Sequence, residues 1–367
     1  MPLAWGTMAL SCAQMAQLFD TLTIRGVTFK NRIAVSPMCQ YSAQDGFAND
    51  WHLVHLGSRA IGGASLVIAE ATAVEARGRI SPSDLGIWHD AHIEPLARIV
   101  RFLEEHGAVA GIQIAHAGRK AATGRPWEGG KPLADEAGGW DVVGASPIPF
   151  DDQHRVPHEL SVDEIAGIRE QFCAAAQRAL SAGFRYLELH AAHGYLLHSF
   201  LSPLSNQRTD AYGGSFENRA RFLLETVRAL RALWPRDRVF GVRLSCTDWV
   251  PGGWTIEDTV QLAQLLERED IDLIDCSAGG NVAKAIIPTG PGYQVGFAEA
   301  VKRATKLHVA AVGLITEAQQ ANAIIAENKA DFVFLARQFL RDPYFGINAA
   351  RALGHKPVVP PQYGRAH

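Results

Sequence analysis

Residues 162–193 read VDEIAGIREQFCAAAQRALSAGFRYLELHAAH and contain one helix–strand unit. Residues 162–183 carry apolar side chains at helical spacing and end in Gly183, as helices commonly do. The next run, FRYLELHAAH (184–193), is short and apolar, which is typical of a buried strand. A helix that leads directly into such a strand indicates an α/β protein with a parallel sheet.

The same alternation recurs along the whole chain. Longer segments of helical period, such as 92–107 and 255–269, separate short apolar runs. The predicted strands are RIAVSPMC (32–39), ASLVIAEATAV (64–74), AVAGIQIAH (108–116), FRYLELHAAH (184–193), RVFGVRLS (238–245), IDLIDCSAG (271–279), LHVAAVGLI (307–315) and DFVFLARQF (331–339). Eight strand–helix units are what a (β/α)8 TIM barrel requires.

Three further segments complete the predicted organisation. Before the first strand, LFDTLTI and VTFKN flank Arg25 and Gly26, which predicts a β-hairpin at the bottom of the barrel. Residues 121–160, after the third strand, form a long Gly- and Pro-containing loop, and loops of that length are usually functional. Residues 1–14 are expected to be a loosely attached tail, so that 15–367 form a single barrel domain.

Composition narrows the possible partners and the compartment. The chain has 367 residues, is 47% hydrophobic and carries a formal net charge of −3, with no basic tract. Nucleic acid and membrane surfaces are therefore not expected as partners. The first fourteen residues lack the positive charge of a signal peptide. Five scattered cysteines without a CxxC motif suggest neither disulfides nor a thiolate zinc site, which fits the cytoplasm.

Polar residues gather at the ends of the predicted strands, where barrels of this kind build their active sites. Arg243 lies inside an apolar run, where a cation is costly unless an anion or strong acceptor meets it. Gly313 and Arg337 follow the seventh and eighth strands, where barrels commonly bind phosphate. The other candidates are Ser36, Pro37, Met38, Cys39, Tyr41, Ala71, Gln113, His116, His190, His193, Tyr195 and Ser277.

The residues alone leave three interpretations of His190 and His193. In a metal-dependent barrel hydrolase the pair would bind a metal with His116 and Glu188, but the first strand has no H-x-H motif. A hydrogen-bonded core pair is the second interpretation. In the third, two imidazole N–H groups hold one substrate oxygen and Tyr195 delivers a proton. That site lacks a nucleophile, which points to a cofactor.

The absence of nucleotide motifs narrows the choice of cofactor. No GxGxxG follows the first predicted strand and no P-loop motif occurs, so a separate dinucleotide-binding fold is not expected. A noncovalent flavin mononucleotide (FMN) suits the remaining parts. Its phosphate would lie at Gly313 and Arg337, while Arg243 and Gln113 would meet the polar edge of the ring.

From about Leu18 to Arg365 the chain resembles the old yellow enzyme family of FMN-dependent ene-reductases. It is most similar to the thermophilic-like subgroup, which includes NADPH dehydrogenases and xenobiotic reductases. The long motif 188–222 is the most specific of those that carry the resemblance. These motifs are KNRIAVSPMCQYS, GRISPSDLGIWHDAHI, GIQIAHAGRKA, ELHAAHGYLLHSFLSPLSNQRTDAYGGSFENRARF, LIDCSAGG, GYQVGFAE and FLARQFLRDP.

The resemblance implies a role for each matching position. FMN would contact Ser36, Pro37, Met38, Cys39, Ala71, Gln113, Arg243, Gly313, Ala336 and Arg337. His190 and His193 would hold the substrate carbonyl or nitro oxygen, Tyr195 would donate the proton, and Tyr41 would contact substrate. NADPH, with NADH as an alternative, would donate hydride in a ping-pong reduction of electron-poor alkenes, without a metal ion. A homodimer or homotetramer is implied, in which Arg365 reaches the substrate site of a neighbouring subunit.

Overall fold

The computed structural model describes residues 17–366, so the tail expected over residues 1–14 lies outside the described residues. Eight parallel strands close into a barrel, because the last strand along the chain hydrogen-bonds to the first. In chain order they are β3 (Ile33–Val35), β4 (Leu66–Ala73), β5 (Val109–Ala115), β8 (Tyr186–Ala191), β9 (Val239–Ser245), β10 (Leu273–Ser277), β11 (His308–Val312) and β12 (Phe332–Leu335). Each strand lies within one predicted run, which confirms the (β/α)8 barrel.

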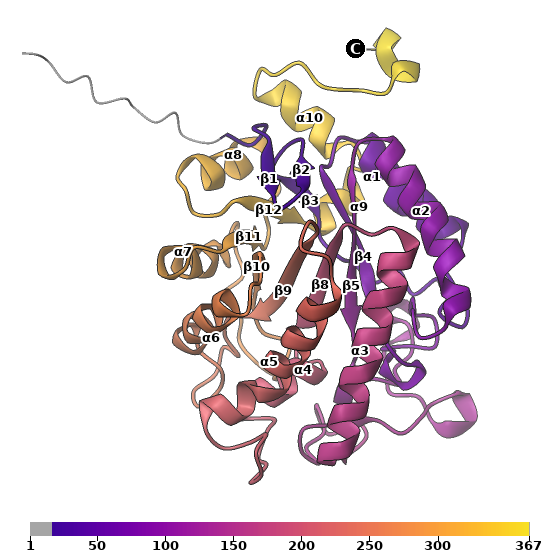
Figure 1. The fold of residues 1–367 in the computed structure, drawn as a ribbon, viewed down its shortest axis with the longest axis vertical. Helices are drawn as coiled ribbons and strands as arrows, with labels where there is room; N and C mark the ends of the chain where they lie inside the picture. Colours follow the sequence, from indigo (N-terminus) through magenta and orange to yellow (C-terminus); the bar gives the residue numbers. More distant parts are fainter. Residues whose placement is uncertain (1–16, 367) are drawn as a thin grey trace, which may run out of the picture.

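Helices surround the barrel (Figure 1). They are α1 (Asp50–Ile61), α2 (Ile93–Glu105), α3 (Val162–Ala182), α5 (Phe216–Leu233), α6 (Ile256–Arg268), α7 (Val295–Ala304), α8 (Ala318–Ala326) and α10 (Phe345–Ala352). Gly183 ends α3 with φ 99°, as predicted, and Thr255 caps α6 by accepting from the backbone N–H of Asp258. Two short helices, α4 (Leu196–Leu201) and α9 (Arg337–Arg341), follow β8 and β12.

The predicted hairpin closes one end of the barrel. β1 (Leu22–Ile24) and β2 (Val27–Phe29) pair antiparallel around the predicted turn. Their buried side chains Ile24, Val27 and Phe29 join inward-facing barrel residues such as Phe332 in one apolar cluster. This burial stabilises the plug by about 25 cal/mol per Å² of apolar surface. Because the plug fills the end at which the strands begin, the opposite end is left for a site.

The loop over residues 121–160 contains short regular elements that the sequence did not predict. β6 (Val143–Gly144) and β7 (His158–Glu159) form a two-stranded parallel sheet. Two 3-10 turns, Pro126–Glu128 and Asp135–Ala137, lie between β5 and β6. These pairings satisfy backbone groups that so long a connection would otherwise leave to solvent. The loop and α4 lie at the end of the barrel opposite the hairpin and α10 (Figure 1).

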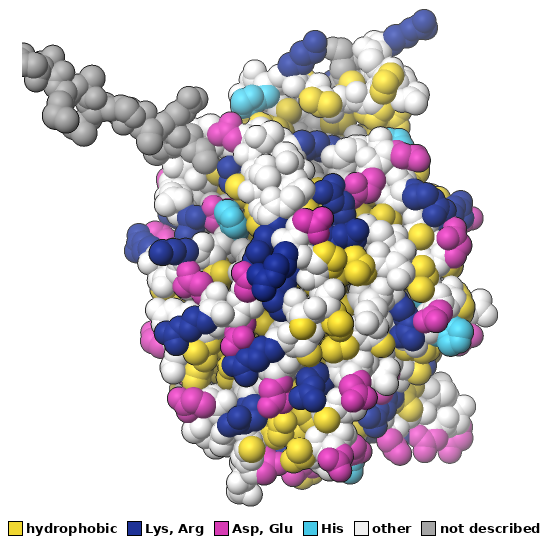
Figure 2. Space-filling model, viewed as in Figure 1, with side chains coloured by type: hydrophobic (Ala, Val, Ile, Leu, Met, Phe, Trp, Pro, Cys, Tyr) yellow, Lys and Arg dark blue, Asp and Glu magenta, His cyan; other side chains and the backbone are white. Residues whose placement is uncertain are grey.

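The surface carries both signs of charge. Figure 2 shows acidic and basic side chains interspersed over one face, with small apolar areas between them. A mixed surface of this kind creates no extended field of one sign on that face. None of the helices in the described part of the chain combines the length and apolar character needed to cross a bilayer.

Candidate active site

Strand alternation turns the predicted side chains toward the barrel mouth. Tyr186 belongs to the inner apolar cluster, whereas Leu187 and Leu189 pack outside the barrel. Since successive residues point to opposite faces of a strand, His190 points inward with Tyr186. Arg243 on β9 lies in register beside His190. The structure therefore brings together residues that are far apart in the sequence.

The two histidines and Tyr195 form one aromatic group at this mouth. The ring centroids of His190 and His193 are 5.2 Å apart, and those of His190 and Tyr195 are 5.1 Å apart. Desolvation by the surrounding protein lowers the pKa of both imidazoles well below the usual value, and Arg243 lowers it further. Both rings are therefore neutral at pH 7, and each has one N–H to donate.

The turn after β8 is held in an unusual backbone conformation. His193 has φ 60° and Gly194 has φ 74°. The Gly194 N–H donates to Nδ1 of His198 over 2.8 Å. The Nζ of Lys120 donates to the carbonyl oxygens of His193 and Gly280 over 2.9 and 2.8 Å. Left-handed backbone at a residue other than glycine is costly, so these bonds keep His193 in place.

Tyr195 remains a protonated phenol. Desolvation raises its pKa well above the usual value, with the nearby Cys39 and Tyr41 as further causes. Burial likewise raises the pKa of Cys39, so its sulfur remains a thiol. Tyr41 has φ 49° and makes an edge-on contact with Trp127 from the long loop, with ring centroids 5.8 Å apart. Ala71 and Tyr195 line a common small cavity.

A cavity of about 170 Å³ lies beside this group, at the ends of β11 and β12. Arg243, Arg337 and Arg341 line it, together with Gly313 and Ala336. Gly313 has φ 118°, and a Cβ there would come within 2.8 Å of Nε2 of Gln294. Three guanidinium groups around a glycine turn are suited to a phosphate. The structure thus unites the predicted phosphate residues with Arg243.

Like the cationic cavity, the hydroxyl of Ser36 indicates that a polar ligand binds here. This hydroxyl is buried and has no hydrogen-bond partner within the described residues. Buried polar atoms nearly always have one, so a bound molecule is expected to supply it. Pro37, Met38 and Cys39 continue from Ser36 as a half-buried segment. This orphan hydroxyl, the cationic cavity and Gln113 together fit a phosphorylated, polar-edged ring such as FMN.

The metal interpretation does not match the positions of the side chains. Nε2 of His116 lies 2.7 Å from Oε1 of Glu75, and its Nδ1 accepts from the Gly118 N–H. Both nitrogens of His116 are therefore occupied away from the histidine pair. Glu188 binds Gln113 instead of joining a ligand set. Within residues 17–366 no group of three or more His, Cys, Asp or Glu side chains is arranged to hold a metal ion.

Arg365, predicted to contact substrate, lies apart from the barrel mouth. It is exposed on the C-terminal 3-10 helix Pro361–Ala366. That helix extends beyond α10, at the plugged end of the barrel (Figure 1). Within one subunit Arg365 therefore does not reach the mouth.

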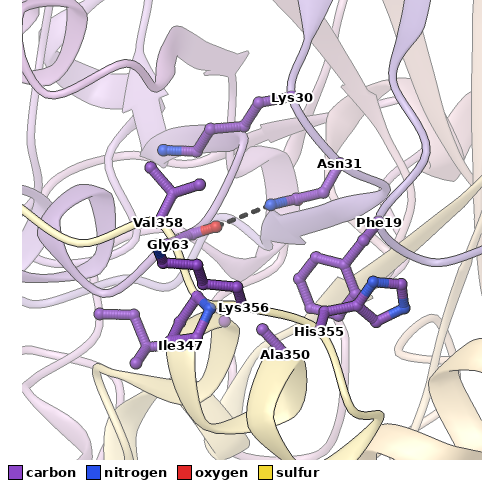
Figure 3. A pocket seen from close by; sticks show the side chains of 11 residues that line it. Phe19, Lys30, Asn31, Gly63, Ile347, Ala350, His355, Lys356 and Val358 are labelled. Atoms are coloured by element: carbon purple, nitrogen blue, oxygen red, sulfur yellow. Dashed lines mark hydrogen bonds between the residues drawn. The ribbon is translucent and has the colours of Figure 1, made fainter. Parts of the chain in front are cut away.

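A second cavity, of about 250 Å³, lies at the plugged end. Figure 3 shows the rings of Phe19 and His355 beside each other there, while Lys30 and Lys356 extend near Val358. None of the predicted site residues lines this cavity. It is separate from the mouth.

Sequence reasoning missed several residues that the structure adds to the site. Tyr293, Gln294 and Arg341 line the cationic cavity. Tyr293 and Gln294 lie in the motif GYQVGFAE and Arg341 lies in FLARQFLRDP, but the sequence alone assigned none of the three to the site. Ser277 lies at the end of β10 as expected. Its contact with His193, with its hydroxyl 2.7 Å from Nε2, was not predicted. That contact depends on β8 and β10 lying on either side of β9, which no local pattern reveals.

A barrel with a cationic cavity, a buried hydroxyl without a partner and a pair of neutral imidazoles fits one class of protein, the flavin-binding barrel oxidoreductases. The family model described as NADH:flavin oxidoreductase / NADH oxidase matches residues 17–355. The chain is also 47% identical over 352 residues to the NADPH dehydrogenase of Bacillus cytotoxicus, covering 95% of this chain and 96% of that protein. The chain therefore belongs to the NADH:flavin oxidoreductase / NADH oxidase family.

Solved structures agree with this assignment. Morphinone reductase, an old yellow enzyme, has a TM-score of 0.79 at 27% identity, covering 96% of this chain and 93% of that one. Morphinone reductase in complex with tetrahydroNAD has a TM-score of 0.77 at 29% identity, covering 95% and 93%. The resemblance to the old yellow enzyme family is thereby confirmed. The protein is an FMN-dependent oxidoreductase that uses NAD(P)H.

Proposed function

We propose that this enzyme reduces the C=C bond of activated alkenes, such as enones and enals, and also accepts nitro compounds. The observation that carries the proposal is the pair of neutral imidazoles beside a protonated phenol. Two N–H donors suit an oxygen that gains negative charge during reduction. A phenol beside them suits proton delivery to the carbon next to the carbonyl group.

FMN would supply the hydride transfer, accepting hydride from NAD(P)H and passing it to the β-carbon of the alkene in two half-reactions. Arg337 and Gly313 would hold its phosphate, and Arg243 and Gln113 the polar edge of its ring. Ser36 would contact it through the hydroxyl that now lacks a partner. The binding of both substrates at one mouth accounts for a chain that needs no second nucleotide-binding fold.

The remaining roles belong to side chains at the mouth. His190 and His193 bind the substrate oxygen, and Tyr195 protonates the α-carbon. Tyr41, with Trp127 against its ring, forms part of the substrate wall. The same proposal includes a cytoplasmic location and a homodimer or homotetramer. In that assembly the exposed Arg365 serves the site of a neighbouring subunit, since it lies far from its own.

The test separates the two half-reactions in the Tyr195→Phe variant. Stopped-flow absorbance would follow flavin bleaching by NADPH and then its return on addition of 2-cyclohexenone, both without oxygen. We expect bleaching to be little changed and the return to slow by about 10²- to 10⁴-fold, since a positioned proton donor contributes that much. Tyr212→Phe is the matched control, because its hydroxyl binds Glu225 on α5 instead. A return rate in Tyr195→Phe equal to that of the native enzyme would remove Tyr195 from the mechanism.

A further inference from the structure

A polar layer lies inside the barrel between the apolar plug and the mouth. Glu188 on β8 and Asp275 on β10 are both 0% exposed. Nε of Arg243, on the strand between them, lies 2.9 Å from Oδ2 of Asp275. Arg243 also lowers the pKa of Glu188 electrostatically, so one cation acts on both carboxyl groups. Neither Glu188 nor Asp275 has a role in the proposed reaction.

The second carboxylate sets the orientation of a residue that faces the cofactor. Nε2 of Gln113 donates to Oε1 of Glu188 over 2.8 Å, and Oη of Tyr186 donates to Oε2 over 2.7 Å. Both oxygens of Glu188 accept in these two contacts, so the amide of Gln113 turns its NH2 group toward Glu188. Its carbonyl oxygen is then left for another donor. The pyrimidine edge of a flavin offers such a donor.

The charges of this layer do not balance unless it holds a proton. Burial raises the pKa of both Glu188 and Asp275, and for Glu188 the negative Asp275 is the next cause. Neither oxygen of Asp275 accepts a well-aligned hydrogen bond within the described residues. Two buried carboxylates beside one cation favour retention of one proton between them.

Among residues 17–366, the side chains around the pair include no further charge to offset it. From β5 the pair meets Gln113, from β8 Tyr186 and the neutral His190, and from β9 Arg243. The other barrel strands contribute apolar groups to the inner cluster, namely Ala34, Leu66, Ile68, Ala310, Val312, Phe332 and Phe334. The charges that shift the pKa values of the pair are those of Arg243 and, for Glu188, Asp275. Protonation of the pair itself is therefore the way for this layer to reach neutrality.

We propose that Glu188 and Asp275 are positioning residues that share one proton beneath the flavin, keep the layer neutral together with Arg243, and orient the amide of Gln113. The inference rests on FMN binding at this mouth. Loss of the shared proton leaves an uncompensated negative charge close to the ring. That charge opposes electron uptake by the flavin, so the midpoint potential falls more steeply with rising pH than the flavin alone would require.

The first test compares Glu188→Gln with the native holoenzyme. Dye equilibration would give the midpoint potential between about pH 6 and about pH 9, a range that spans the raised carboxyl pKa values. We expect the additional fall with pH to disappear in Glu188→Gln. Its FMN dissociation constant, measured by flavin fluorescence, should rise about three- to tenfold, because glutamine also donates and lets Gln113 flip. Glu225→Gln, which changes a carboxylate beside Tyr212, should do neither.

Tyr186→Phe adds a directional check. It removes one hydrogen bond that favours ionised Glu188, so the additional fall in potential should move to higher pH. A second measurement needs no variant. Infrared difference spectra of the native enzyme, oxidised against reduced, should contain a protonated-carboxyl band that vanishes at high pH.

Either of two results would overturn the inference. One is a folded Glu188→Gln variant with native FMN affinity and native pH dependence of the potential. The other is a native enzyme without a protonated-carboxyl band at neutral pH. Neither measurement uses an alkene. A failure of the proposed alkene reduction would therefore leave these readouts intact and distinguishable.

Discussion

The way in which His190 and His193 can donate to a substrate oxygen depends on which nitrogen of each ring carries the proton. The Ala192 N–H donates to Nδ1 of His190 over 3.3 Å, which places the ring proton on Nε2. Nε2 of His193 instead faces the hydroxyl of Ser277 at 2.7 Å. If Ser277 donates, the proton of His193 lies on Nδ1. His190 then donates through Nε2 and His193 through Nδ1.

We predict that Ser277→Ala raises KM for 2-cyclohexenone by about 5- to 20-fold, because His193 loses the partner that selects its tautomer. Ser277→Thr keeps the hydroxyl and should restore a near-native KM. Steady-state kinetics at saturating FMN measures both variants, and FMN content must be checked because Ser277 also lines the cationic cavity. An unchanged KM in Ser277→Ala at full FMN occupancy would show that the tautomer does not depend on this serine.

The lowered pKa values predict the pH dependence of substrate binding. The usual imidazole value is 6.5, and His190 and His193 titrate well below it. As pH falls through 6.5 both rings stay neutral, so the affinity for an enone should not change there. A pair that titrated normally would gain positive charge below pH 6.5 and bind the carbonyl oxygen more tightly. The dissociation constant of the enone, followed through the flavin spectrum from about pH 8 to about pH 5.5, distinguishes the two cases.

The turn that joins β8 to α4 places two of the three proposed catalytic side chains. Its Gly194 packs so closely that a Cβ would lie 2.3 Å from the carbonyl oxygen of Gly280. Behind the turn, His198 and Asp248 are both 0% exposed, with Nε2 and Oδ1 3.4 Å apart. The imidazole of His198 thus connects the Gly194 N–H to a buried carboxylate.

We predict that Gly194→Ala lowers the free energy of unfolding by more than about 2 kcal/mol and abolishes enone reduction. The left-handed backbone alone costs an alanine about 1–2 kcal/mol, and the clash adds to it. Gly167→Ala is the matched control, because this residue lies within α3 and an added Cβ would meet nothing within 4 Å. That change should stabilise the protein by about 0.5–1 kcal/mol. Urea unfolding and flavin turnover measure both; a native-like Gly194→Ala would mean that the turn relaxes.

The elements differ in how well local sequence could predict them. β9 and β10 lie within predicted runs because a mainly apolar stretch such as VFGVRLS is long enough to be recognised as a strand. β6 and β7 were missed, since strands of two residues have no period. His190 and Arg243 were found because the fold places strand ends at the mouth. The hydrogen bond of Gly194 to His198 was missed because it depends on the left-handed backbone of the turn at His193 and Gly194. The hydrogen bond of Gln113 to Glu188 was missed because it joins two separate strands.

The two ends of the barrel differ in structure: one is closed by apolar packing and the other carries the polar site. The hairpin and its apolar cluster close one end, and the polar groups meet at the other. The C-terminal segment leaves the closed end, with Val358 83% exposed and Arg365 on its last turn. A segment that exposes an aliphatic side chain and an arginine to solvent is suited to contact with a second copy of the chain. This arrangement makes the proposed sharing of sites testable.

We predict that mixed subunits recover activity that neither parent has. Tyr195→Phe keeps the arginine but lacks the proton donor, whereas Arg365→Ala keeps the donor but lacks the arginine. A mixed dimer contains one site with both groups. Random reassociation of equal amounts should therefore restore about a quarter of native sites, because half of the dimers are mixed and each has one intact site. Activity at low enone concentration, before and after coexpression, measures the recovery.

Two controls decide what the recovery means. Gln362→Ala, on the same exposed segment, should be nearly as active as the native enzyme and should gain nothing from mixing. Light scattering on the native protein must find at least a dimer. If Arg365 acts only within its own chain, or has no role at the mouth, the mixture gives the average of its parents. Recovery above that average requires an arginine supplied across the interface, since no single chain in the mixture carries both groups.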